Sequence, residues 1–445
     1  MTSAGRRFNP FRIWHDLPLA PRIVGALVIG VIVGLIFHDK AAVCRELSDV
    51  ILKLLRALVI PLIFVAVVSS LIKADISSQS AKKIAWLLVS NTLVAISIGL
   101  VVVNIIRPGN WAKLAPPTMT DMTATGPNAT FDEAVAGAIK RNEAKAKSKP
   151  FDPWAEVKDK VPDSIVGSFT AGKDVISVIF VAIAFGVAFR RVRTKQMLDG
   201  RVDYLPIEQS IETLFECMMI ALHWIIDVIP LAVFGVVAAI VGQKGFAPFV
   251  SLGAFVVAVV TALILQVVFY LTRVTLSSWV RPREFIKGGS EALMTAFATA
   301  SSTATMPLTY ACLKDKVGVR DESASMGALV GSNFNNDGTA LYEAMAPLFI
   351  AQALGMVMPI PRQIVVAFMA VIASVGAPGI PEAGLVTMLL VFTTVGLPIE
   401  YVPLLLTVDW FLDRCRTAVN VMGDMTVSCI LDGKSRATQS REDTS

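Results

Sequence analysis

An all-α polytopic membrane fold is predicted for this chain by its apolar composition, by repeated apolar runs, and by the placement of its basic residues. Of its 445 residues, 54% are hydrophobic and only 17% are charged, which is too apolar for a soluble globular protein of this length. Runs able to cross about 30 Å of hydrocarbon recur along the chain, at residues 23–37, 54–72, 84–106, 175–189 and 249–271. We therefore expect a bundle of membrane-spanning helices.

The composition also argues against several other classes of protein. The five cysteines have no CxxC spacing and the three histidines lie far apart, so we predict neither a resident metal site nor a disulfide framework. No HExxH or GxSxG motif occurs, so an intramembrane enzyme finds little support. We expect no enzymatic activity, no cofactor and no nucleic-acid partner. The first apolar stretch follows a basic N-terminus without a convincing cleavage site, so we expect it to be retained as a span.

Basic residues at the ends of the apolar runs predict the orientation of the chain. Lys and Arg gather between residues 73 and 83, between 190 and 195, and between 281 and 287. These connections follow the second, fourth and sixth spans, an even number of crossings from the basic N-terminus. Since cytoplasmic loops carry the excess of Lys and Arg, the N-terminus is expected on the cytoplasmic side.

Two apolar stretches do not fit a simple crossing. Residues 292–312 have basic residues at both ends, and two full crossings would need roughly 40 residues, so we predict a re-entrant hairpin. Residues 364–397 would form a helix about 50 Å long, but two prolines and three glycines lie between Ser374 and Gly384. A second hairpin fits this stretch. The alternative is two ordinary spans joined by a short loop.

These observations divide the chain into an ordered series of segments. We expect a cytoplasmic N-terminus (1–20), three spans (21–106), an extracellular polar loop (107–163), spans four to six (164–280), re-entrant hairpin one (284–314), a seventh span (322–356) with an unwound Asn335–Thr339 segment, re-entrant hairpin two (361–397), an eighth span (400–431) and a cytoplasmic tail (432–445).

The last span contains the densest group of ionisable residues in any apolar segment. Each charge near the bilayer centre costs roughly 2.5–3.5 kcal/mol, so these side chains must face protein, water or a ligand. At 100° per residue, one face within about 100° presents Asp413, Arg416, Thr417, Asn420 and Asp424. This face offers an anion receptor, an amide and two carboxylates. The alternative interpretation is an internal salt-bridge network that only holds helices together.

Two further polar segments interrupt apolar runs. Residues 333–339 contain four amide or carboxylate residues and a glycine, and an unwound backbone there would expose oxygens suited to a hard monovalent cation. Glu343 follows one turn later, and its apolar surroundings favour the neutral carboxyl, so it is a proton or counter-ion candidate. It could equally be a paired structural acid. Residues 301–307 place small hydroxyl groups before a proline, which suits a hairpin tip facing an anion.

These motifs resemble those of the dicarboxylate/amino acid:cation symporters, the family of bacterial glutamate transporters and their animal relatives. The resemblance covers nearly the whole chain after Ala20 and rests on residues 301–307, 335–343, 374–384 and 409–424. It implies eight transmembrane helices, two re-entrant hairpins, inverted repeats and a homotrimer. It further implies a scaffold region from spans one, two, four and five, and a transport region that moves like an elevator, with the second hairpin as its gate.

The resemblance also implies roles for individual residues. Arg416 would bind the side-chain carboxylate of an acidic amino acid, and Asp413 its amino group. The rest of the substrate site would comprise Ser301, Ser302, Thr303, Thr339, Gly379, Thr417 and Asn420. The ligands of transported cations would comprise Ser90, Gly331, Asn333, Asn335, Asp337, Ser374, Val375, Ala377, Asn420 and Asp424.

The chain departs from the family pattern at four positions. Asn336 replaces a methionine, Glu382 replaces a glycine, and Trp86 and Val89 stand where tyrosine and threonine are usual. We therefore expect the third span to lack hydroxyl ligands for Asp337 apart from Ser90, with fewer Na⁺ ions per cycle and partial H⁺ coupling.

The sequence thus predicts a symporter that takes up glutamate or aspartate together with Na⁺ and/or H⁺. We expect it in the plasma membrane, or in the inner membrane of a bacterial cell, among lipid and as a homotrimer. A C4-dicarboxylate symporter is the alternative within the family, and an anion channel is the alternative from another class.

Overall fold

The computed structural model describes residues 19–73, 78–111, 164–169, 175–376 and 383–435. Within these ranges the chain is helical and contains no strand. The first half comprises α2 (Leu19–Phe37), η1 (His38–Cys44), α3 (Arg45–Lys73), α4 (Ser78–Ile106), η2 (Pro108–Asn110), η4 (Val166–Phe169), α7 (Val175–Leu198), α8 (Leu205–Lys244) and α9 (Ala247–Ser277). The second half comprises α10 (Pro282–Thr299), α11 (Ser302–Ala311), η5 (Cys312–Val317), α12 (Asp321–Ser325), η6 (Met326–Val330), α13 (Gly331–Phe334), α14 (Asp337–Ala353), α15 (Ile360–Gly376), α16 (Ala383–Thr394), η7 (Ile399–Tyr401) and α17 (Val402–Asp432).

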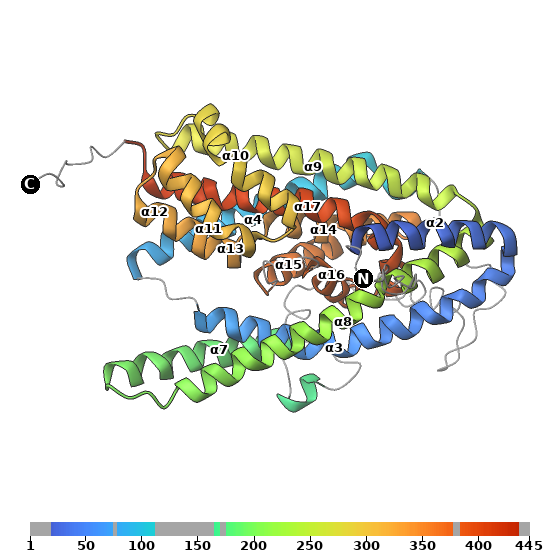
Figure 1. The fold of residues 1–445 in the computed structure, drawn as a ribbon, viewed down its shortest axis with the longest axis horizontal. Coiled ribbons are helices and arrows are strands. Elements are labelled where there is room, and N and C mark those ends of the chain that lie inside the picture. Colours follow the sequence, from blue (N-terminus) through green and yellow to red (C-terminus); the bar gives the residue numbers. More distant parts are fainter. Residues whose placement is uncertain (1–18, 74–77, 112–163, 170–174, 377–382, 436–445) are drawn as a thin grey trace, which may run out of the picture.

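The helices α2, α3, α7 and α8 pack together as one group (Figure 1). Small residues allow α2 to approach α8 closely, since a Cβ at Gly30 would lie 2.9 Å from the carbonyl oxygen of Phe234. Arg22 of α2 and Asp227 of α8 form an ion pair of 2.9 Å at the same contact. Close backbone contact and a charge pair therefore hold these helices in register.

The second group surrounds α14 and α17. All residues of α14 except Gln352 are buried, as expected for a helix that is covered by α4, α9, α15, α16 and α17. Figure 1 places α9, α10 and α17 on the side of the molecule opposite α3, α7 and α8, with α15 and α16 between them. The arms α15 and α16 accordingly contact α3 as well as α14.

The two segments expected to be hairpins each consist of two helices. α10 ends where Ala300 adopts a left-handed backbone (φ 52°), and α11 begins two residues later. Ser301 caps α11, because its Oγ accepts a hydrogen bond of 3.1 Å from the backbone nitrogen of Ala304. α15 and α16 flank residues 377–382, which lie outside the described part of the chain.

The seventh apolar segment breaks over a shorter distance than the sequence suggests. α13 ends at Phe334 and α14 starts at Asp337, so only Asn335 and Asn336 depart from helical geometry. The segment from Asp337 to Thr339 is helical rather than unwound. An aspartate at the first position of a helix is favourable, because the free backbone N–H groups there attract negative charge.

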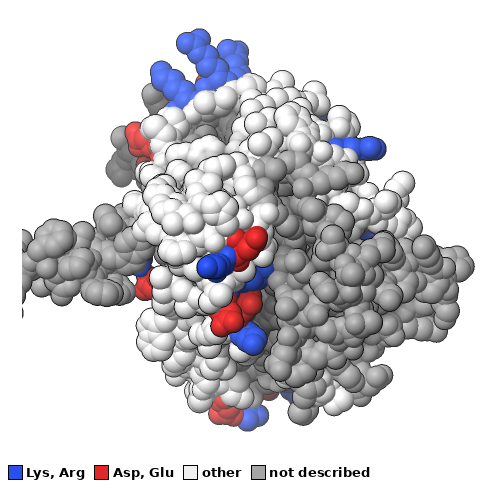
Figure 2. Space-filling view, turned by 90° about the vertical axis from the view of Figure 1, so that its right-hand side faces the viewer, with Lys and Arg blue, Asp and Glu red and all other residues white. Residues whose placement is uncertain are grey.

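The surface is suited to a membrane. Four helical stretches in the described part of the chain are long and apolar enough to span a bilayer, at Pro21–Ile51, Lys82–Asn110, Leu205–Gln243 and Phe249–Ser277. Large apolar side chains on them are exposed, including Ile29, Ile36, Trp224, Val257 and Ile264. Among the described residues in the face shown in Figure 2, charged side chains form a few small clusters with uncharged residues around them. The fold is that of a helical, multi-pass membrane protein.

Candidate functional site

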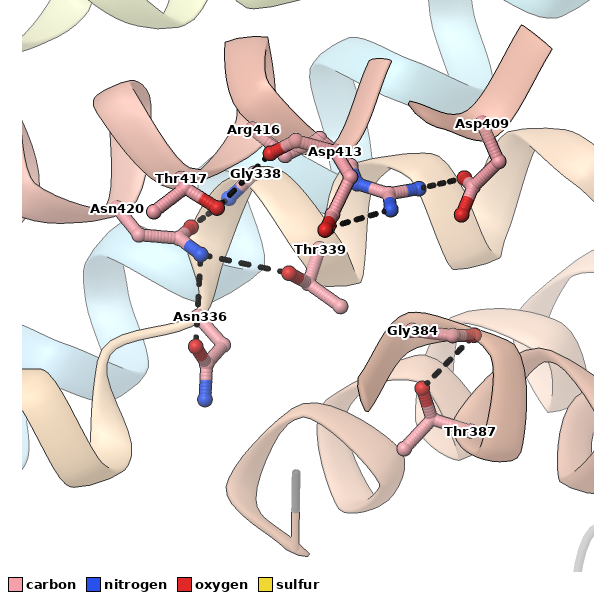
Figure 3. Close-up of polar contacts among 10 residues, drawn as sticks. All are labelled: Asn336, Gly338, Thr339, Gly384, Thr387, Asp409, Asp413, Arg416, Thr417 and Asn420. Atoms are coloured by element: carbon pink, nitrogen blue, oxygen red, sulfur yellow. Dashed lines mark hydrogen bonds and ion pairs between the residues drawn. The ribbon is translucent and has the colours of Figure 1, made fainter. Parts of the chain in front are cut away.

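Arg416 lies at the centre of a buried group of charges on α17. Its Nη1 lies 2.9 Å from Oδ1 of Asp409, and its Nη2 donates a 2.8 Å hydrogen bond to Oδ1 of Asp413. The guanidinium carbon lies 4.0 Å from the ring centroid of Tyr342 on α14, a cation–π distance. Figure 3 shows the guanidinium between the two carboxylates. Spacings of three and seven residues bring both acids onto the arginine's helix face.

The guanidinium retains an unused donor. Within the described residues, Nε of Arg416 is buried and has no hydrogen-bond acceptor. A buried polar group left unpaired costs roughly 1–3 kcal/mol, so this position favours a further oxygen acceptor. Gly384 in the first turn of α16 faces the same group, because a Cβ there would lie 3.2 Å from Nη2. The second arm of the second hairpin therefore covers the arginine.

Asn420 joins α17 to the break before α14 (Figure 3). Its Oδ1 accepts a 2.7 Å hydrogen bond from the backbone nitrogen of Gly338. Its Nδ2 donates to Oγ1 of Thr339 at 3.3 Å and to Oδ1 of Asn336 at 3.4 Å. One turn earlier, Oγ1 of Thr417 donates to the carbonyl of Asp413 at 2.8 Å. The amide fixes the helix start beside the charged residues.

Asp424 lies further along the same face and faces the same break. Nδ2 of Asn335 donates to Oδ1 of Asp424 at 2.9 Å and to the carbonyl of Asn420 at 3.0 Å. Gly331 packs directly on the carboxylate, where a Cβ would collide with it. Oδ1 of Asn335 is buried and has no donor among the described residues. A buried carboxylate and a buried, unpaired amide oxygen therefore lie at the same helix break.

The expectation that the third span offers Asp337 little oxygen is wrong. Thr92 of α4 donates to Oδ1 of Asp337 at 2.6 Å, and Tyr270 of α9 donates to Oδ2 at 2.5 Å. Trp86 and Val89 are instead 70% and 45% exposed. Their exposure places Trp86 and Val89 on the outer side of α4, whereas Asn91, Thr92 and Ala95 are buried.

The serines of the first hairpin lie beside α13. Oγ of Ser302 donates to the carbonyl of Ser332 at 3.3 Å, and Ser301 caps α11. Thr303 is exposed. α11 packs against both α13 and α17, so the hairpin is adjacent to the charged face.

The second hairpin contacts the helix break through Ser374. Its carbonyl accepts a 3.0 Å hydrogen bond from Nδ2 of Asn336. The break before α14 is therefore tied to α15 by a polar contact. Two predicted ligands, Ala377 and Gly379, lie outside the described residues, and so does Glu382. The side chains of the predicted ligands Asn333 and Val375 are not described either.

Glu343 is fully buried near the middle of α14. Its neighbours in electrostatic contact are Thr387 of α16, Arg416 and Asp409. The structure thus brings this acid, predicted as a proton or counter-ion candidate, to the charged group on α17.

Sequence reasoning missed four residues of this site. Asp409 stands two helical turns before Arg416, so helical spacing was a signal that could have included it. Tyr342 could not be placed over Arg416 by spacing, because the two lie on different helices. Thr92 and Tyr270 reach Asp337 from α4 and α9, and only the packing of these helices reveals the contact.

A buried guanidinium, flanked by carboxylates and covered by a broken helix and a hairpin arm inside a multi-pass helical protein, defines a membrane transporter of a charged solute. Comparison with known proteins agrees. The profile of the Sodium:dicarboxylate symporter family matches residues 19–434. The chain belongs to this family.

Individual relatives are similar along most of their length. Excitatory amino acid transporter 3 of Mus musculus is 29% identical over 490 residues, covering 100% of this chain and 90% of the relative. Excitatory amino acid transporter 2 of Homo sapiens is 31% identical over 462 residues, covering 93% and 78%. An excitatory amino acid transporter of Caenorhabditis elegans is 28% identical over 448 residues, covering 90% and 84%.

Proposed function

We propose that this protein is a secondary active symporter that couples uptake of glutamate or aspartate to inward movement of Na⁺ and/or H⁺. The observation that carries the proposal is the buried pair of Arg416 and Asp413, whose opposite charges lie 2.8 Å apart on one helix face. An acidic amino acid presents the complementary pair, a carboxylate and an ammonium group. The names of the relatives support this substrate class.

Substrate binding would proceed by exchange of ion pairs. The side-chain carboxylate of the substrate takes the unused Nε and one terminal nitrogen of Arg416, in the bidentate geometry that guanidinium favours. The ammonium group then pairs with Asp413. Asp409 remains 2.9 Å from Nη1 and keeps the arginine oriented throughout.

The same exchange disfavours the alternative, a C4-dicarboxylate. Such a substrate would engage Arg416 but offer no cation to Asp413. Breaking a buried ion pair without replacing one partner costs about 3–5 kcal/mol, which is a factor of a hundred or more in affinity. The acid at position 413 therefore favours amino acids over dicarboxylates.

The proposed Na⁺ site is centred on Asp424. Asn335 and the backbone of Gly331 lie against its carboxylate, and the broken helix supplies carbonyl oxygens nearby. The carbonyls expected from the second hairpin, with Ser374 at their start, would close the site from the other side. The cation enters as a co-transported substrate, and its binding links the α13–α14 break to that hairpin.

Glu343 is the proposed proton carrier. It is fully buried beside Arg416 and Asp409, and neither of its carboxyl oxygens accepts a hydrogen bond from the described residues. A proton could enter and leave with the substrate cycle, because substrate binding changes the charge around Arg416.

We further propose the arrangement that the resemblance implies: eight transmembrane helices and two re-entrant hairpins, built as inverted repeats, in a homotrimer of the plasma membrane or bacterial inner membrane. The group α2, α3, α7 and α8 would be the scaffold, and the helices around α14 and α17 would be the moving transport region. The contacts of α15 and α16 with α3 support a position of the second hairpin between these two regions.

An anion channel is the remaining alternative, since helix ends inside a bilayer favour anions. Purified protein in liposomes separates the two. A carrier loaded with unlabelled aspartate should take up labelled aspartate by counterflow, with saturation and with competition by glutamate but weakly by succinate. Uptake that does not saturate and is not accelerated by internal aspartate would contradict a carrier.

A further inference from the structure

Arg273 is a charged residue on α9 that the proposed site does not use. It stands four residues before the end of an otherwise apolar helix. Its Nη1 donates to Oγ of Ser90 at 3.1 Å and also to Oδ1 of Asn91, both on α4. The guanidinium carbon lies 5.6 Å from the ring centroid of Phe269, one turn earlier. Three contacts therefore turn this charge inward, toward the neighbouring helix.

The guanidinium joins the polar group around Asp337. Tyr270, one turn before Arg273, donates to Asp337, and Thr92, next to Asn91, donates to its other oxygen. Arg273 and Asp337 interact electrostatically. Asp337 is completely buried, and a positive charge close by stabilises its charged form against the loss of hydration.

We propose that Arg273 is a tethered cation that balances Asp337, so that this carboxylate does not take up a transported ion. The inference rests on the proposed cation-coupled symport and deepens it, by assigning Na⁺ to Asp424 and excluding it from Asp337. The hydroxyl groups of Thr92 and Tyr270 donate to both oxygens of Asp337, and Arg273 adds a fixed positive charge beside this polar group.

Asp424 provides the contrast within the same bundle. Its hydrogen-bond partner is the amide of Asn335, and the charged group that acts on it is a second carboxylate, Asp337. A carboxylate with these neighbours gains most from a mobile cation. Because of Arg273, Asp337 has a fixed positive charge nearby, whereas Asp424 does not.

A simpler role for Arg273 is orientation of the helix, because arginines near cytoplasmic helix ends often reach toward lipid head groups. The inward contacts with Ser90 and Asn91 argue against it. The two roles also differ in their consequences. An orienting charge would leave the number of bound cations unchanged when removed, whereas a tethered cation would be replaced by Na⁺.

The test is equilibrium binding of L-aspartate to the purified full-length protein across a range of NaCl concentrations. The slope of log Kd against log[Na⁺] counts the cations bound with the substrate. Arg273→Gln should steepen the slope by about one cation, so that each tenfold change in Na⁺ changes Kd by about a further factor of ten. Arg273→Lys keeps the charge and should keep the wild-type slope. Equal slopes in wild type and Arg273→Gln would overturn the proposal.

Two further variants keep the test decisive. In Arg273→Gln/Asp337→Asn, both charges are gone and the wild-type slope should return, while a slope that stays steep would overturn the proposal. If Arg273→Gln does not fold, Asp337→Asn alone decides. Its slope should equal that of wild type, and loss of one cation would show that Asp337 binds Na⁺.

Failure of the proposed function would be recognised separately. Wild-type protein that binds no aspartate at any Na⁺ concentration would contradict the substrate and leave Arg273 to be tested by thermal unfolding without substrate. Arg273→Gln should then show a larger Na⁺-dependent rise in Tm than wild type. Equal rises would overturn the tethered-cation role.

Discussion

Two inward-facing arginines, Arg416 and Arg273, differ in what surrounds them. Arg416 is fully buried between two carboxylates of its own helix and keeps a free Nε. Arg273 is partly exposed and donates to an amide and a hydroxyl oxygen on another helix. Around Arg416 negative charge is in excess, and its partners can be exchanged. Arg273, in contrast, is one positive charge that interacts with one buried acid, Asp337.

This difference indicates how one type of side chain serves two purposes. An arginine with competing carboxylates can release one of them when a ligand supplies another, with little net change in buried charge. An arginine fixed by neutral oxygens has no such exchange and contributes a permanent charge instead. The first arrangement suits recognition, and the second suits setting the charge of a neighbouring site.

The largest effect is expected from Arg416→Cys. Without the guanidinium, the substrate carboxylate would be buried unpaired, so aspartate and glutamate uptake should fall by at least about a hundredfold. Neutral amino acids should then compete better than acidic ones in proteoliposome uptake. Arg414→Cys is the matched control, because this neighbour points to the carbonyls of Phe297 and Ala298, and it should retain acid-selective uptake. Unchanged glutamate uptake in Arg416→Cys would refute the assignment.

Asp413→Asn should have a smaller and selective effect. Aspartate binding loses an ion pair with its ammonium group and should weaken by about tenfold or more. Succinate has no ammonium group and should bind as well as before or better. Competition of unlabelled aspartate and of succinate with labelled aspartate measures the ratio of their affinities. An equal loss of affinity for the two would indicate a structural role for Asp413.

Glu343→Gln tests proton coupling at the same group. In the wild type, an inward proton gradient in sodium-free buffer should stimulate aspartate uptake if Glu343 carries the proton. The glutamine variant mimics the protonated acid at all pH values, so exchange of internal and external aspartate should persist while stimulation by the proton gradient disappears. Stimulation retained in the variant would assign the proton to another group.

The smallest effect is expected at the outer face of α4. Trp86→Tyr and Val89→Thr would each add a hydroxyl group to α4, but both side chains are exposed, and Thr92 is the α4 residue that donates to Asp337. Stability should change by no more than about 0.5 kcal/mol, and the Na⁺ slope of aspartate binding should not change. Thr92→Ala is the comparison, because it removes a donor to Asp337, and it should destabilise the protein by about 1–3 kcal/mol.

The parts of this molecule that sequence could predict are those encoded within one helix. Asp413, Arg416, Asn420 and Asp424 share a face of α17 because helical spacing places them there, and the structure finds all four buried. The helix break at Asn335 was likewise indicated by consecutive amide residues, although it proved shorter than expected.

The parts that sequence could not predict depend on contacts between helices. To know which residue of α4 reaches Asp337, one must know which face of α4 meets α14. The sequence alone pointed to Val89, whereas in the structure Thr92, three residues later, donates to Asp337. The inward turn of Arg273 depends on Ser90 and Asn91, more than 180 positions earlier in the chain. No spacing rule within either segment connects them.

The central claim, that an acidic amino acid is carried with cations, is tested most directly by uphill transport. Proteoliposomes containing the wild-type protein should accumulate labelled L-aspartate above its external concentration when an inward Na⁺ gradient is imposed. The accumulated label should leave when an ionophore collapses that gradient. Internal aspartate that never exceeds the external concentration, under either a Na⁺ or a proton gradient, would contradict coupled symport.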